Sequence, residues 1–126
     1  DEAWVWRIES LSGLPELDAK IKKASKTKYK SIDEVSLSIA EVLSDFLFIH
    51  PFREGNGRVS RLIGDIILAK NGLPMIGLDL KSSDNYIAKV HEGYAKNYEP
   101  LAELLKEKII FCMVLYFLFL QGLAAM

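Results

Sequence analysis

The chain has 126 residues, of which 50% are hydrophobic and 26% charged, and its formal net charge is −1. This length fits one compact domain with a buried core, and the composition is typical of an ordinary soluble protein. The balanced charge excludes attraction to nucleic acid by a global positive field, and the single cysteine, Cys112, excludes a disulfide framework. We therefore expect one domain over residues 1–126, in a reducing compartment such as the cytoplasm.

The first thirty residues carry weak structural signals. The sequence begins at Asp1 without a signal-peptide pattern, and it is either a whole domain core or a fragment of a longer chain. Residues 4–7 are compatible with a short strand or hairpin, and residues 12–15 favour a loop. Six lysines between residues 19 and 30 favour a solvated helix face or loop over a docking patch. They do not indicate a nucleic-acid surface, because Tyr29 is the only aromatic residue among them.

A strong helical pattern begins after residue 30. Ser31 followed by Glu34 forms a capping box, which satisfies free amides at a helix start. Apolar residues then recur at steps of three and four and predict a largely buried helix. This stripe consists of Val35, Ile39, Val42, Phe46 and Ile49. Pro51 disfavours helical backbone at the residue before it, so we expect the helix to end near His50.

The rest of the chain also favours helices. A second apolar pattern runs from about Gly57 to Lys70, residues 73–83 favour a loop or short extended piece, and residues 84–97 favour another helix. Pro100 opens a last helix through Ile109. No segment predicts a sheet, so the expected class is all-α, with at most one small hairpin near the N-terminus.

The apolar segment 109–126 follows this last helix. Its run of twelve apolar residues, 109–120, is short for a membrane span. We expect it to be buried, or to form a contact in a homo-oligomer, rather than to attach to a membrane.

The segment between the two strong helices, residues 50–61, has the sequence HPFREGNGRVSR and favours phosphate chemistry. Two glycines around Asn56 let the backbone approach a ligand closely. The loop leads into a helix start, where free amides and the helix dipole favour an anion. Arg58 and Arg61 are three residues apart, and guanidinium groups bind phosphate oxygens as a fork.

Two further side chains complete this candidate site. Glu54 supplies a carboxylate for Mg²⁺ that bridges phosphates, and His50 suits a general base near neutral pH. Each residue also has a plainer interpretation: His50 as a helix cap, residues 55–57 as an ordinary turn, and Arg61 as the partner of Asp65. The coincidence of all of them within twelve residues favours a functional site.

The pattern of this segment resembles the signature of the Fic family (filamentation induced by cAMP), H-x-F-x-[D/E]-G-N-G-R-x-x-R. Every fixed position of that signature is matched: His50, Phe52, Glu54, Gly55, Asn56, Gly57, Arg58 and Arg61. The resemblance covers roughly residues 12–108 and implies a compact all-α domain. It also implies a hairpin flap before the motif helices, for which residues 4–7 are the candidate.

The resemblance implies a protein adenylyltransferase. His50 would take the proton from a Ser, Thr or Tyr hydroxyl of a target protein, which attacks the α-phosphorus of ATP. Glu54 would hold Mg²⁺, residues 55–57 would line an anion hole, and Asn56 would also contact the α-phosphate. Arg58 and Arg61 would contact the β- and γ-phosphates, and Phe52 would anchor the loop in the core. Tyr86 and His91 are the candidates for contact with adenine.

Other activities within the family remain open. Relatives of the Doc type are kinases and typically carry lysine at the second motif glycine, where this chain has Gly57. Removal of AMP from a modified protein, and a catalytically silent binding module, are further alternatives. The inhibitory pattern [S/T]-x-x-x-E-[G/N] of many relatives does not occur in this sequence. Restraint would then come from an upstream segment or from a separate antitoxin, or would be absent.

Overall fold

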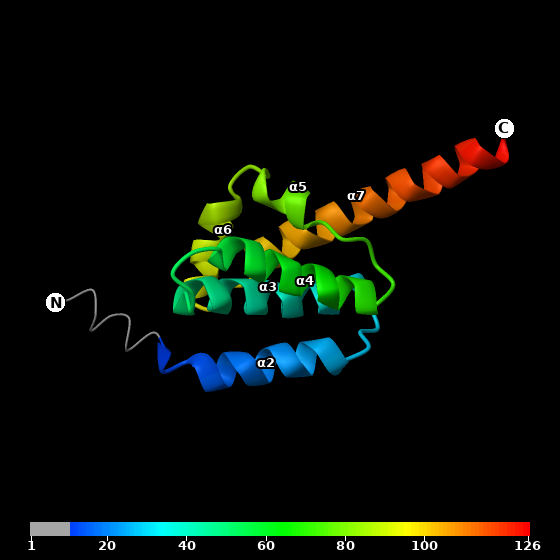
Figure 1. Cartoon of the computed structure of the whole chain (residues 1–126). Helices are drawn as coiled ribbons and strands as arrows, with labels where there is room; N and C mark the ends of the chain where they lie inside the picture. Colours follow the sequence, from blue (N-terminus) through cyan, green and yellow to red (C-terminus); the bar gives the residue numbers. More distant parts are fainter. Residues whose placement is uncertain (1–10) are drawn as a thin grey trace.

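A computed structural model describes residues 11–126 and contains six α-helices and no strand within that range (Figure 1). The helices are α2 (Leu14–Lys26), α3 (Ile32–Ile49), α4 (Asn56–Lys70), α5 (Gly77–Lys81), α6 (Tyr86–Tyr94) and α7 (Glu99–Ala124). The predicted all-α class is confirmed. The hairpin expected at residues 4–7 lies outside the described residues.

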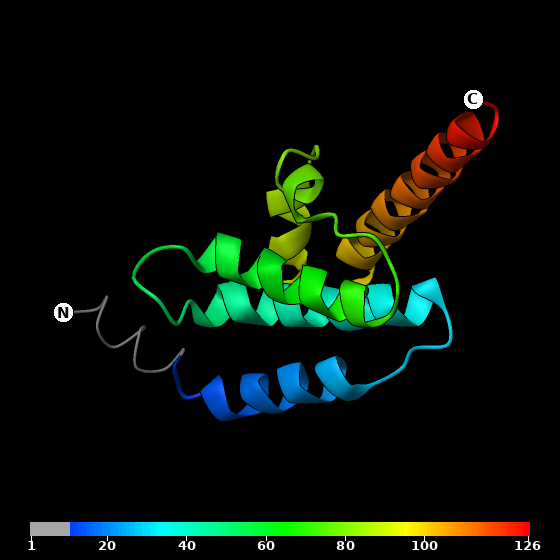
Figure 2. The same ribbon diagram turned by 45° about the vertical axis from the view of Figure 1, so that its right-hand side comes forward.

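Helix α3 is the centre of the domain and contacts α2, α4, α6 and α7. Figures 1 and 2 show α3 and α4 side by side, with α2 running along them and α6 and α7 on another side. All five residues of the predicted apolar stripe are buried. Each neighbouring helix covers part of the apolar surface of α3 and removes it from water. Because that surface is broad, α3 is most stable at the centre of the domain.

Both ends of α3 follow from their local sequence. Ser31 Oγ accepts a hydrogen bond from the Glu34 amide at 3.1 Å, and the Glu34 carboxylate accepts one from the Lys30 amide at 3.1 Å. At the other end His50 takes a left-handed conformation with φ 55°, and its amide donates to the Phe46 carbonyl at 2.8 Å. The helix therefore ends where the position of Pro51 predicts, and His50 is the first residue after it.

Helix α2 corrects one expectation. Residues 12–15 were expected to form a loop, but the helix begins at Leu14, with Pro15 in its first turn. Proline is well tolerated there because the first amides of a helix have no intrahelical acceptor. Leu17 and Ala24 are buried against the domain, while five of the six lysines of residues 19–30 are exposed. The solvated-face interpretation of those lysines is confirmed for α2.

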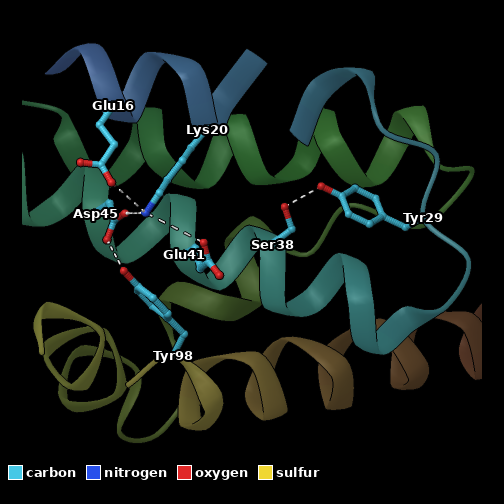
Figure 3. A network of polar contacts seen from close by, with 7 residues as sticks. All are labelled: Glu16, Lys20, Tyr29, Ser38, Glu41, Asp45 and Tyr98. Atoms are coloured by element: carbon cyan, nitrogen blue, oxygen red, sulfur yellow. Dashed lines mark hydrogen bonds and ion pairs between the residues drawn. The ribbon is translucent and has the colours of Figure 1, made fainter. Parts of the chain in front are cut away.

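A polar network ties α2 to α3 and to the start of α7 (Figure 3). Lys20 Nζ lies 2.6 Å from one oxygen of Asp45, and the Tyr98 hydroxyl donates to the other at 2.7 Å. Glu16 and Glu41 each lie 3.9 Å from Lys20. Partial burial alone would lower the pKa of Lys20, but the hydrogen bond and charge of Asp45 raise it above its ordinary value. Burial and Asp45 together also raise the pKa of Tyr98.

Replacing Asp45 by asparagine should lower the free energy of unfolding by about 1–2 kcal/mol, because Lys20 loses its nearest charged partner and keeps only the carboxylates of Glu16 and Glu41 at 3.9 Å. Urea denaturation measures this loss. Because both pKa values are raised on folding, the stabilisation is complete below about pH 10 and is lost as pH rises further. The matched control is Asp18→Asn, which breaks the exposed Asp18–Lys22 pair and should cost clearly less, because water screens an exposed ion pair. Equal losses in both variants would contradict the argument.

The last helix corrects a second expectation. Its first turns are buried through Leu105 and Ile109, but nearly every side chain from Ile110 to Met126 is exposed. Figures 1 and 2 show this half of α7 projecting away from the other helices. The expected burial of residues 109–126 within the chain is therefore wrong.

Candidate active site

The loop between α3 and α4 is closed by a side chain rather than by an apolar anchor. Asn56 is 3% exposed, its Oδ1 accepts from the Phe52 amide at 2.9 Å, and its Nδ2 donates to the Phe52 carbonyl at 2.7 Å. The Phe52 ring, expected to anchor the loop in the core, is 50% exposed and only meets Phe46 at a centroid distance of 6.3 Å. That expectation is wrong, and Asn56 fixes the loop instead.

The start of α4 is an uncapped helix N-terminus. Gly55 precedes the helix with φ 82°, a conformation that other residues rarely adopt. The first intrahelical bond runs from the Val59 amide to the Gly55 carbonyl at 2.9 Å, so the amides of residues 56–58 precede the helical ladder. Among residues 11–126 no side chain caps this terminus, and no acidic residue stands in its first turn. The positive end of the helix dipole is therefore available to an anion.

Both motif arginines fold back over this first turn. A Cβ built on Gly55 would lie 3.3 Å from Arg58 Nη2, and one built on Gly57 would lie 2.9 Å from Arg61 Nη1. Because both positions are glycine, the guanidinium groups occupy the space that a side chain would fill. Within residues 11–126, neither arginine has a carboxylate within 4.0 Å. The two positive charges thus reinforce the helix terminus.

Arg61 does not form an ion pair with Asp65, so the plainer interpretation of Arg61 as the partner of Asp65 is wrong. One carboxylate oxygen of Asp65 instead accepts hydrogen bonds from the amides of Ile76 at 2.8 Å and Gly77 at 3.0 Å. These amides open α5, which forms inside the segment expected to be a loop. Asp65 therefore holds α5 against α4 and leaves the Arg61 guanidinium unneutralised. The sequence carries no local signal for this contact, because the two partners are eleven and twelve residues apart.

Tyr86 and His91, the candidates for contact with adenine, occupy different environments. Tyr86 is 2% exposed and belongs to the core. Burial raises the pKa of its hydroxyl, which the nearby Arg61 guanidinium lowers in part, although no hydrogen bond of good geometry joins them. His91 is exposed, with its ring 5.0 Å from that of Tyr94. Only Tyr86 therefore lies beside a motif residue.

Glu54 and His50 are the remaining predicted site residues. Glu54 is exposed and His50 is half-buried, and neither side chain makes a hydrogen bond or ion pair to any residue from 11 onward. The described part of the chain has no cluster of three or more metal-ligating side chains. A single free carboxylate beside an anion site fits Mg²⁺ that arrives with phosphates, because this ion is commonly bound by one or two carboxylates together with substrate phosphates.

Comparison with known proteins agrees with this geometry. A model of the Fic/DOC family matches residues 8–68. The chain is 36% identical over 54 residues to a protein adenylyltransferase of Caenorhabditis elegans. This aligned segment covers 43% of this chain and 11% of that protein. It is 40% identical over 64 residues to a probable protein adenylyltransferase of Aquifex aeolicus, covering 51% of this chain and 19% of that protein.

The family model includes the whole of α3 and the loop that follows it, and most of α4. The aligned segments span about a tenth and a fifth of the length of the relatives. No solved structure matches the chain significantly. The family model, the two relatives and the intact signature agree on one assignment: residues 8–68 of the chain match the Fic/DOC family.

Proposed function

We propose that the chain transfers AMP from ATP to a Ser, Thr or Tyr hydroxyl of a target protein and releases pyrophosphate. The observation that carries this proposal is the start of α4, where open amides lie on one helix turn with two guanidinium groups that no carboxylate of residues 11–126 pairs with. Such a site binds a chain of phosphates and neutralises the charge that develops during phosphoryl transfer. The names of the relatives support adenylyl transfer as the reaction.

The reaction would use several groups of this chain. His50 takes the proton of the target hydroxyl, whose oxygen forms a bond to the α-phosphorus while the bond from that phosphorus to pyrophosphate breaks. The amides of residues 56–58 receive the developing negative charge, and Arg58 and Arg61 hold the β- and γ-phosphates. Asn56 keeps the loop closed through Phe52, and its own contact with the α-phosphate remains a prediction.

Glu54 is the group that would hold Mg²⁺ against the phosphates. The ion would neutralise phosphate charge when it is bound. The exposed position of Glu54 in the loop leaves its carboxylate free for that contact.

A labelling experiment tests the proposal. The purified chain is incubated with Mg²⁺, a cell lysate and ATP labelled on either the α- or the γ-phosphate. We expect protein-bound label from the α-labelled nucleotide only, and none when EDTA removes Mg²⁺. Transfer of the γ-label would instead show a kinase of the Doc type. Absence of both labels, with ATP binding retained, would favour a silent binding module and overturn the proposal for this chain.

A further inference from the structure

The second half of α7 is an apolar rod that the domain does not cover. Its most apolar 18-residue stretch has a mean hydropathy of 1.7, and only 6% of that stretch is buried. Four of its aromatic side chains, Phe111, Tyr116, Phe117 and Phe119, are 58–65% exposed. Exposed apolar surface of this extent marks a site of contact with another apolar phase.

The exposed apolar residues surround the helix. Residues 116–119 follow one another at about 100° around the axis and are all apolar or aromatic and exposed. A helix that docks in a groove of a partner protein carries its apolar residues on one side and polar residues on the other. Apolar side chains on every side instead match a uniform apolar surrounding, which a lipid bilayer provides.

The length of this segment also fits lipid. Residues 110–124 of α7 contain no charged side chain and extend about 22 Å as a helix, long enough to reach through most of the roughly 30 Å of a bilayer hydrocarbon core. Residues 109–126 were expected not to attach to a membrane for two reasons: the apolar run 109–120 is short, and the segment was expected to be buried within the domain. The uncovered helix removes that second argument.

The domain meets α7 at a boundary that suits a membrane surface. Lys106 and Lys108 stand just before the apolar segment. One turn further along α7, the Cys112 thiol lies 3.9 Å from the carboxylate of Asp79. Asp79 belongs to α5, which contacts α7 there. On and beside α5, Leu78 is 91% exposed and Met75 is 67% exposed. Lysines next to apolar side chains are typical of the interface between water and lipid.

We propose that residues 110–124 of α7 insert into a lipid bilayer, with Met75 and Leu78 lying at its surface. The loop between α3 and α4 lies at the opposite end of the molecule from the projecting half of α7 (Figures 1 and 2). Insertion therefore leaves the candidate active site in water, where ATP and a target protein reach it. This inference is independent of the proposed reaction, because it uses none of the motif residues.

Flotation of the full chain tests the insertion. The chain is synthesised in vitro with phosphatidylcholine vesicles and centrifuged through a density gradient, before and after extraction at high salt and in alkaline carbonate. We expect it to float in all three conditions. The double variant Leu115→Lys and Leu118→Lys changes only exposed positions, and each lysine should lower partitioning on the order of a hundredfold. The floating fraction should therefore fall at least tenfold.

The matched control is Ile87→Lys on α6, where the side chain is 58% exposed, as Leu118 is, but lies outside the proposed lipid contact. This variant should float like the wild-type chain. Failure of the wild-type chain to float would overturn the proposal. So would flotation only on vesicles with anionic lipid followed by release in salt, which would show surface binding through the lysines. Cross-linked dimers without flotation would show that a second copy covers α7.

Discussion

Replacing His50 by asparagine should lower the rate of AMP transfer by about 100- to 10,000-fold, the range that a general base contributes. Asparagine is the informative substitution because His50 has φ 55°, a left-handed conformation that asparagine adopts readily. Alanine at the same position would add backbone strain of about 1 kcal/mol and confuse loss of the base with distortion of the loop. Single-turnover kinetics with α-labelled ATP measures the change.

ATP binding and the free energy of unfolding should stay close to wild type in this variant, because the imidazole makes no hydrogen bond or ion pair within residues 11–126. His91→Asn is the matched control, since His91 is exposed and the chain has two histidines. The control should retain full activity. A His50→Asn enzyme with undiminished transfer would mean that another group, or water alone, accepts the proton.

The elements that local chemistry specifies were predictable from the sequence. The limits of α3 follow from Ser31, Glu34 and Pro51, each of which acts on backbone within four residues of itself. The candidate site was predictable for the same reason, because the glycines and arginines that shape the start of α4 are neighbours in the chain. The structure brings the open amides and the two guanidinium groups together on this turn, and phosphate binding by them stays a prediction.

The features that sequence reasoning missed depend on contacts between distant segments. Asp65 was considered only as a partner for Arg61 one turn away, whereas it caps α5. Phe52 was expected in the core because it is aromatic, but the bonds of Asn56 close the loop without it. The apolar segment 109–126 has the composition of a buried helix, and composition does not specify whether neighbouring helices reach it. These cases share one cause: tertiary packing decides which side chains are covered.

The space above Gly57 should be needed for ATP binding and not for stability. Gly57→Ala places a methyl group 2.9 Å from Arg61 Nη1, at the flexible end of that side chain, so the guanidinium must move. Alanine favours helix over glycine by up to about 1 kcal/mol, so the variant should be at least as stable as wild type. Losing one charge-assisted hydrogen bond to a phosphate should weaken ATP binding about ten- to a hundredfold.

Calorimetric titration with Mg²⁺ and ATP, in a His50→Asn background that prevents turnover, measures this effect. Gly122→Ala is the matched control, because Gly122 is also helical and has no atom within 4 Å of an added Cβ. A double-mutant cycle identifies the cause: once Arg61→Ala has removed the guanidinium, Gly57→Ala should weaken binding no further. If Gly57→Ala still weakened binding in that background, the methyl group would be blocking the amides of the helix terminus. The phosphates would then depend on the amides of residues 56–58 more than on Arg61.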